Sequence, residues 1–239
     1  MDFISQSALQ FAVAVLLAGP GLVHAQDERP ASADTTASAD RPLAAAERNV
    51  TRAVNVVRQL ELDTRMHPLL GAAKGIFIVP AYKRAAVGIG AEGGTGLLLV
   101  KRDDGNWSQP VFYNTGSLSL GLQAGVQGGA LAFVLNNQKA VDAFLKKTSV
   151  SLSATAGLTI MNWNRMVEGS ARAGDVVAWA DSKGLFGDAA TVELNGVRYS
   201  QNLNNAYYRR TLSASEIIGG KTSNPQSSLL VDALASSAR

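Results

Sequence analysis

Cysteine is absent from the sequence, and histidine occurs only twice, at His24 and His67. Without cysteine the chain can hold no disulfide, no thiolate metal site and no thiol nucleophile. His67 stands beside a proline with no second imidazole near it, so the sequence predicts a hydrogen-bonded loop histidine rather than a metal ligand. No G-x-S-x-G nucleophile elbow occurs either. We therefore expect no enzyme, no catalytic residue, no metal and no cofactor.

Aromatic residues are scarce, at 6% of the chain, and they form no series interleaved with basic residues. The chain has 22 Lys and Arg against 19 Asp and Glu. Residues 1–41 hold two of the basic and five of the acidic residues, which leaves 20 against 14, a net charge of +6, for the rest. This mildly basic balance favours an anionic surface as partner, and without a stacking series it does not favour nucleic acid.

No apolar run is long enough to span a bilayer, which takes roughly 20 residues. The run Ala8–Leu17 is typical of a secretory signal, and Val23-His24-Ala25 fits a cleavage site, so we expect residues 1–25 to be a signal peptide. Residues 1–7 carry no Lys or Arg, which leaves a short buried or anchoring helix as the alternative. Because no cysteine follows the run to carry a lipid anchor, we expect an exported protein, either periplasmic or secreted, or peripherally membrane-associated.

The chain after this segment divides into three parts. Residues 26–41 are polar, aperiodic and rich in Ala, Ser, Thr and Asp, which predicts a disordered linker. One domain is expected at 42–218, with Pro42 at the first position of its first helix. Residues 219–239 are expected to form a C-terminal tail with a short helix.

Apolar residues alternate with polar or bare ones along the stretch 117–135. Alternation is typical of strands with one covered face, and the stretch is too long for one strand, so the sequence predicts a bend at Gly128-Gly129. A second alternating run spans 149–160, while 3.6-residue periodicity predicts helices at 43–62 and 137–147. These patterns predict an α+β fold: a curved, largely antiparallel sheet, barrel- or sandwich-like, flanked by a few helices.

The region before this stretch is rich in glycine. Gly88, Gly90 and Gly93 match G-x-G-x-x-G, but a dinucleotide site needs a helix after the glycines, and the strand-like run 97–100 follows here. We expect these glycines to allow tight curvature or close approach between strands. The apolar stretch 75–80 is expected to form a short strand that ends at its proline.

Four stretches stand in order along the chain: Ala73-Lys-Gly-Ile-Phe-Ile-Val-Pro80, Trp107-Ser-Gln-Pro-Val-Phe-Tyr113, Asp181-Ser-Lys-Gly-Leu-Phe-Gly187 and Asn205-Ala-Tyr-Tyr208. They resemble the SYLF domain family over residues 45–218, in the form of a bacterial exported member. The resemblance implies non-enzymatic lipid or membrane-surface binding. In eukaryotic members the ligands are phosphoinositides, and actin binding is also known. The motif residues, to which we assign structural roles, are Lys74, Gly75, Trp107, Pro110, Lys183, Gly184, Tyr207 and Tyr208.

Charge and resemblance together predict a lipid-binding module of the bacterial cell envelope that contacts the membrane without insertion. Its expected partner is an anionic phospholipid or another envelope lipid. The basic residues that we expect to contact headgroups are Arg48, Arg52, Lys83, Arg84, Lys146 and Lys147. The alternative is a structural or adhesive envelope protein that binds a protein partner.

Overall fold

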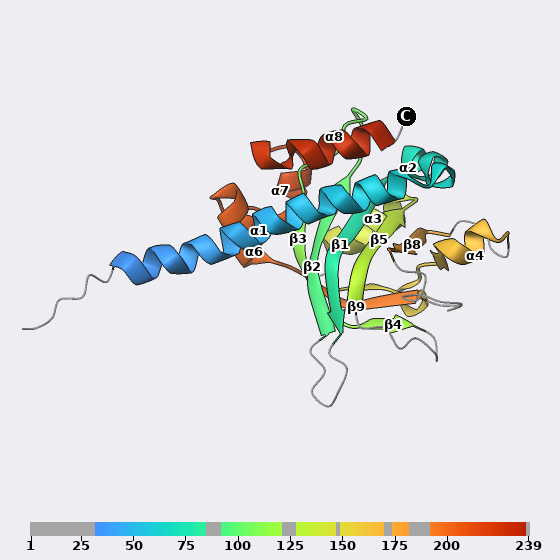
Figure 1. The fold of residues 1–239 in the computed structure, drawn as a ribbon, viewed down its shortest axis with the longest axis horizontal. Coiled ribbons are helices and arrows are strands. Elements are labelled where there is room, and N and C mark those ends of the chain that lie inside the picture. Colours follow the sequence, from blue (N-terminus) through green and yellow to red (C-terminus); the bar gives the residue numbers. More distant parts are fainter. Residues whose placement is uncertain are drawn as a thin grey trace, which may run out of the picture.

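The computed structural model describes residues 32–84, 92–120, 128–146, 149–169, 174–181 and 192–237. A strongly curved sheet forms its centre, and one long helix crosses a face of that sheet (Figure 1). The fold is α+β with a nearly closed, barrel-like and mostly antiparallel sheet, which confirms the predicted fold class.

The strands are β1 (Gly75–Arg84), β2 (Glu92–Val100), β3 (Val111–Thr115), β4 (Leu118–Leu120), β5 (Gly128–Leu135), β6 (Val150–Leu152), β7 (Ile160–Asn162), β8 (Val176–Ala180) and β9 (Val192–Tyr199). The helices are α1 (Ser32–Glu61), α2 (His67–Ala72), α3 (Gln138–Lys146), α4 (Trp163–Val167), α6 (Gln201–Tyr208), α7 (Ala214–Ile218) and α8 (Ser228–Ser237). Short 3-10 turns add η1 (Thr64–Met66), η2 (Ala154–Ala156) and η3 (Pro225–Ser227).

The strand order across the sheet is β4-β9-β3-β2-β1-β5-β8-β7, with β6 paired to β9. Among the described strands, only β7 and β8 pair in parallel. Every residue of β5 from Ala130 to Leu135 is buried, so both faces of this strand are covered, and the polar face predicted for 117–135 is wrong for its second half. The predicted bend at Gly128-Gly129 falls at the start of β5, and residues 121–127 before it lie outside the described residues.

Pro80 does not end β1, contrary to the sequence prediction, because it lies in a β-bulge. Ile78 faces Leu97 of β2, whereas Lys83 faces Gly93, and this pairing leaves one extra residue in β1. A bulged residue makes no regular ladder hydrogen bond, so the missing N–H of proline costs little there. The bulge also bends the central strand, which helps the sheet to curve into a barrel.

The second alternating run, 149–160, is not one strand, which corrects a second prediction. β6 ends at Leu152, and the Ser153 side chain then accepts a hydrogen bond from the Ala156 N–H to start η2. Gly157 turns the chain with a φ of +79°. A hydroxyl that can cap a turn and a left-handed glycine therefore override the alternating pattern.

The glycine-rich stretch allows strands to approach closely, as predicted. A Cβ added to Gly93 would lie 2.5 Å from the carbonyl oxygen of Thr115 in the neighbouring strand. Gly93 stands inside β2 and is followed by strand, not helix, which is incompatible with a dinucleotide site. Gly88 and Gly90 lie outside the described residues.

The two faces of the sheet carry different helices. Phe112 contacts Tyr207 of α6 with 5.0 Å between ring centroids, and Tyr113 contacts Phe144 of α3 at 5.5 Å. Because consecutive strand residues point to opposite faces, α6 and α3 lie on opposite sides of β3. α1 packs against α6 and crosses β1 and β2 on the same side (Figure 1). We call this side the α1 face and the other the α3 face.

α1 packs through the apolar side that the sequence predicted, because Val50, Ala53, Val54, Val57 and Leu60 are all buried. The helix begins at Ser32 instead of Pro42, so the predicted linker is helical from residue 32 onward. Alanine-rich sequence favours helix in this segment, and Pro42 is accommodated inside it.

The C-terminal segment 219–239, which the sequence set apart as a tail, packs on the domain through α8. Leu230 and Leu234 are fully buried. The Ser237 hydroxyl donates to the carboxylate of Glu61 at 2.5 Å, at the end of α1. α8 and α1 therefore form one packed layer over the sheet (Figure 1).

Candidate lipid-contact face

α1 presents a stripe of arginines to solvent. Arg41, Arg48 and Arg52 are seven and four residues apart, which places them on one side of a helix. All three are exposed, and none makes a hydrogen bond or ion pair within the part of the chain that the structure describes. Because the opposite side of α1 is buried on the sheet, this stripe points outward from the α1 face.

Lys83 lies on the same face. It pairs with Gly93 of β2 and with Gly128 of β5. Gly93 is four residues from Leu97, which is paired with Phe112 on the α1 face, so all of these positions share one side. Since both neighbours are glycines, no side chain beside it covers the exposed lysine.

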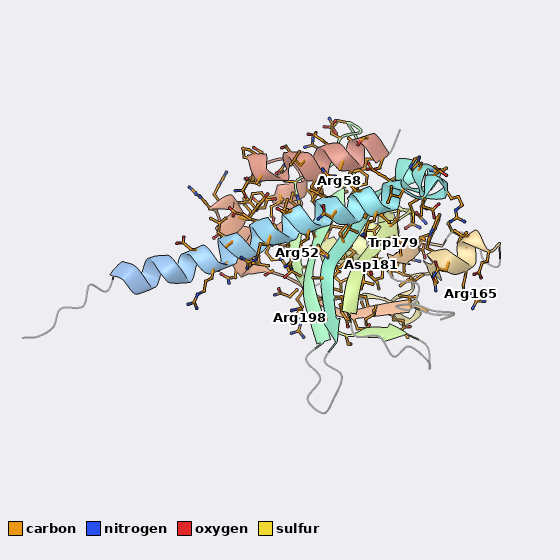
Figure 2. All side chains as sticks on the ribbon, in the orientation of Figure 1. Arg52, Arg58, Arg165, Trp179, Asp181 and Arg198 are labelled. Atoms are coloured by element: carbon orange, nitrogen blue, oxygen red, sulfur yellow. The ribbon has the colours of Figure 1, made fainter. Side chains whose placement is uncertain are left out.

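Arg198 joins these residues, although the sequence prediction missed it. It pairs with Asn114, which is two residues from Phe112 on the α1 face, and it is exposed. Figure 2 labels Arg198 on β9 and Arg52 on α1. The sequence does indicate that Arg198 faces outward, because this charged residue lies between the apolar Val197 and Tyr199. We call Arg41, Arg48, Arg52, Lys83 and Arg198 the basic face.

Lys146 is separated from the basic face. It ends α3, on the opposite side of the sheet, and forms an ion pair with Asp142 one turn earlier. The side chain of Arg84, and Lys147 as a whole, lie outside what the structure describes. Of the six predicted contact residues, the structure therefore brings Arg48, Arg52 and Lys83 together and places Lys146 elsewhere.

Two acidic residues outside α1 are engaged by nearby cations. Hydrogen bonding from Lys146 holds the pKa of Asp142 below its usual range. The backbone N–H of Ser213, helped by Lys221, lowers the pKa of Glu216 to about 2. These carboxylates are ionised at neutral pH and lie beside cations. The paired charges cancel at a distance, whereas the arginines and lysine of the basic face keep their full charge.

Two acidic residues of α1 face the C-terminal segment. Glu47 accepts a hydrogen bond from the side chain of Gln226, and Glu61 accepts one from Ser237. They therefore do not neutralise the arginine stripe. Asp181 is exposed beyond the end of β8.

The motif residues at the start of β1 hold strand ends together. The Lys74 N–H donates to the carbonyl of Leu135 at 2.8 Å, and its own carbonyl accepts from the Lys101 N–H at 2.9 Å. Gly75 is buried, and an added Cβ would lie 3.1 Å from the carbonyl oxygen of Leu99. These contacts give Lys74 and Gly75 the structural roles that the resemblance implied.

The later motif residues fix α6 against β3. Trp107 and Pro110 are buried, and the Pro110 carbonyl accepts a 2.6 Å hydrogen bond from the hydroxyl of Tyr208. Tyr207 packs edge-on against Phe112. Lys183 and Gly184 lie outside the described residues.

Asn204, a fully buried residue that the sequence did not single out, completes this attachment. Its side-chain oxygen accepts the Phe112 N–H at 3.0 Å, and its amide donates to the Phe112 carbonyl at 2.9 Å. The same amide donates to the Ser200 carbonyl. The asparagine thus continues the strand ladder beyond β9 with a side chain.

The residues considered for catalysis or metal binding occupy structural positions. A ring nitrogen of His67 lies 2.9 Å from the Glu61 carbonyl oxygen, so the predicted hydrogen bond is present, but His67 begins α2 instead of lying in a loop. Within the described ranges, no three His, Cys, Asp or Glu side chains gather as metal ligands would. The helices described here also include none with the length and apolar character that a membrane span requires.

The fold and surface define an α+β binding domain whose distinguishing feature is a basic face over a barrel-like sheet. A family model, Ysc84, described as "Las17-binding protein actin regulator", matches residues 116–237, half of the chain. The chain belongs to this family, which confirms the SYLF resemblance. The family is one of binding and regulatory domains.

Relatives with known names match most of the chain at low identity. The human "SH3 domain-containing YSC84-like protein 1" is 27% identical over 187 residues, 73% of this chain and 54% of its own length. An SH3 domain-containing protein of Schizosaccharomyces pombe is 29% identical over 164 residues, 66% of this chain and 37% of its own length. "Protein YSC84" of Saccharomyces cerevisiae is 26% identical over 162 residues, 66% of this chain and 34% of its own length. The chain thus spans about half, or less, of the relatives that it matches.

Proposed function

We propose that this protein binds anionic lipid surfaces of the bacterial cell envelope through the basic face, as a peripheral and non-enzymatic module. The observation that carries the proposal is the exposure of five cations on one side of the sheet, without partners among the described residues. Family membership supports a binding role, and the signal-like residues 1–25, which lie outside the described residues, support an envelope location.

The expected strength follows from the number of cations. Each Lys or Arg close to an anionic membrane contributes about 1 kcal/mol. Arg48 and Arg52 together therefore account for about 2 kcal/mol, a factor of about 30 in affinity. Screening acts over about 8–10 Å at physiological ionic strength, so binding should weaken strongly with salt.

Vesicle co-sedimentation with a pair of matched variants tests the proposal. Arg48→Glu with Arg52→Glu should lower binding to phosphatidylglycerol-containing vesicles by about thirtyfold or more. Lys139→Glu with Lys146→Glu changes the net charge equally but on α3, and it should leave binding nearly unchanged. Equal loss in both variants would show that net charge, and not this face, controls binding.

Varying the lipid charge of the vesicles and the salt concentration tests whether the binding is electrostatic. Wild-type protein should bind anionic vesicles at low salt, release at high salt and ignore purely zwitterionic vesicles in the absence of other contacts. Binding that survives high salt would exclude the electrostatic mechanism. No binding to any vesicle would favour a protein partner, the reading closer to the Las17-binding description of the family.

A further inference from the structure

A cavity of about 440 Å³ lies on the α3 face, over strands β3 and β9. Its base is formed by Tyr113 and Tyr199, which pair across the two strands, and the ring of Tyr113 contacts Phe144 of α3. The end of α3 lines one side of the cavity, and the start of α7 with the residues before it lines the other. Small-molecule sites in proteins typically have volumes of about 300–1,000 Å³, so this cavity can hold a ligand.

The hydroxyl group of each tyrosine is bound to one side of the cavity. The Tyr113 hydroxyl donates to the Phe144 carbonyl at 3.2 Å, and the Tyr199 hydroxyl donates to the Leu212 carbonyl at 2.6 Å. Because both hydroxyl hydrogens are used in this way, the tyrosines offer a ligand their rings instead of a hydrogen-bond donor. Tyr113 is buried and Tyr199 is half-buried, so the ring of Tyr199 is the more accessible of the two.

The electrostatic character of the cavity is negative. Glu216 is the one charged side chain among the described residues that line it. The Ser213 N–H and hydroxyl donate to one oxygen of this carboxylate at 3.0 and 2.9 Å, which keeps it ionised. Burial and the charge of Glu216 raise the pKa of Tyr199 to about 12, so the carboxylate acts on this tyrosine. The last turn of α3 adds the negative end of a helix dipole, and the cavity therefore favours a cation over an anion.

Lys221 already contacts Glu216, but it is not among the residues that line the cavity. Its ammonium nitrogen lies 3.1 Å from the second carboxylate oxygen. The two side chains are 65% and 38% exposed, and an exposed ion pair of this kind contributes little to stability. Because a carboxylate has about four lone-pair sites on its two oxygens, Glu216 can face a second cation from the cavity.

We propose that this cavity binds an organic ammonium group. The face of an aromatic ring attracts a cation within about 6 Å of its centroid, and Tyr199 places such a ring beside the charge of Glu216. The alkyl groups of the ligand displace water from Leu145 and Leu212, which line the cavity. A potassium ion has no alkyl groups, so it lacks this apolar contribution. A free amine and the choline or ethanolamine headgroup of a lipid both carry this chemistry.

Proton NMR with tetramethylammonium chloride and the full chain tests the site. The methyl signal should move in a saturable way, because an aromatic ring shields protons over its face. Added choline should reverse the movement, while potassium chloride at the same concentration should not. Glu216→Gln should weaken the titration by about fivefold, the loss expected for one charge contact near a surface. Glutamine also serves in a capping box, so this variant keeps the start of α7.

Asp142→Asn is the matched control for this variant. Asp142 is also paired with one lysine, but it does not line the cavity, so its replacement should change the affinity by less than about twofold. Tyr199→Phe keeps the ring and should retain binding. Tyr199→Leu removes the ring and should weaken binding by about two- to fivefold. Circular dichroism checks that each variant keeps the fold.

The site is overturned by a methyl signal that does not move in a saturable way, or by equal titrations of wild type and Glu216→Gln. An equal loss in Asp142→Asn also overturns it, because general negative charge would then account for the binding. Phosphatidylcholine vesicles separate the two sources of the ammonium group. Displacement of tetramethylammonium by these vesicles identifies a headgroup, whereas displacement by free choline alone identifies a soluble amine.

The site does not rest on the proposed binding of anionic lipids, because the cavity and the basic face lie on opposite faces of the sheet. Arg48→Glu with Arg52→Glu should therefore keep the movement of the methyl signal. Glu216→Gln should keep binding to phosphatidylglycerol-containing vesicles. The two proposals thus fail in different experiments.

Discussion

Replacing Gly96 with alanine should destabilise the domain because an aromatic ring occupies the space where the methyl group would go. A Cβ at this position would lie 2.5 and 2.9 Å from the Cε atoms of Phe77 and closer still to Cζ. Phe77 is fully buried, with its ring centroid 4.9 Å from that of Phe144 and 6.0 Å from that of Tyr113. The ring therefore has no room to move away.

The expected cost of Gly96→Ala is about 3 kcal/mol in the free energy of unfolding, the upper end for overpacking a core. Phe77→Leu alone should cost about 1–2 kcal/mol, because it removes part of a buried ring. In the double variant the smaller leucine makes room for the added methyl group. The cost of the double variant should therefore be at least about 1 kcal/mol smaller than the sum of the two single-variant costs.

Urea unfolding followed by circular dichroism gives the free energy of unfolding of the wild type, of each single variant and of the double variant. Slopes against urea should be equal among the variants, so that midpoints report stability. Additive costs, within about 0.5 kcal/mol, would show that Phe77 does not lie over Gly96 and would refute the packing of the α3 face described here.

Three further changes have expected outcomes. Asn204→Ala should cost about 3 kcal/mol in urea unfolding, because the buried Phe112 N–H loses its partner, and Asn204→Asp should cost more, since it buries a carboxylate. Because the pKa of Glu216 is lowered to about 2, its stabilising contribution is complete above its ordinary pKa and is lost as the pH falls from about 5 toward 2. Glu216→Gln should therefore flatten the acid limb of the stability curve.

Local periodicity was enough to find the main helices and the fold class, but it failed for the run 149–160 and for the covered sides of 128–135. The apolar side of α1 and the helix at 138–146 follow from the 3.6-residue period, and the α+β class follows from the two periods together. Periodicity says which residues of one element share a side. It does not say which sides of different elements meet, because that depends on pairing between distant strands and on helix packing.

The basic residues illustrate this limit. Arg48 and Arg52 were predicted as one surface because they belong to one helix. Lys146 was added to them by charge alone, and the packing of Phe144 places its helix on the other face of the sheet. Arg198 could be recognised as an outward residue from its alternation, but only its pairing with Asn114 places it beside the others.

The one-residue bulge in β1 decides where Lys83 points. Ile78 and Lys83 are five residues apart, and in a regular strand an odd separation would place them on opposite faces. The extra residue near Pro80 reverses this relation, so Lys83 joins the α1 face and Tyr82 turns inward, where its hydroxyl accepts the Leu118 N–H at 2.7 Å. A proline that local rules assign to a strand end thus sits at the bend that turns Tyr82 into the barrel and Lys83 onto the basic face.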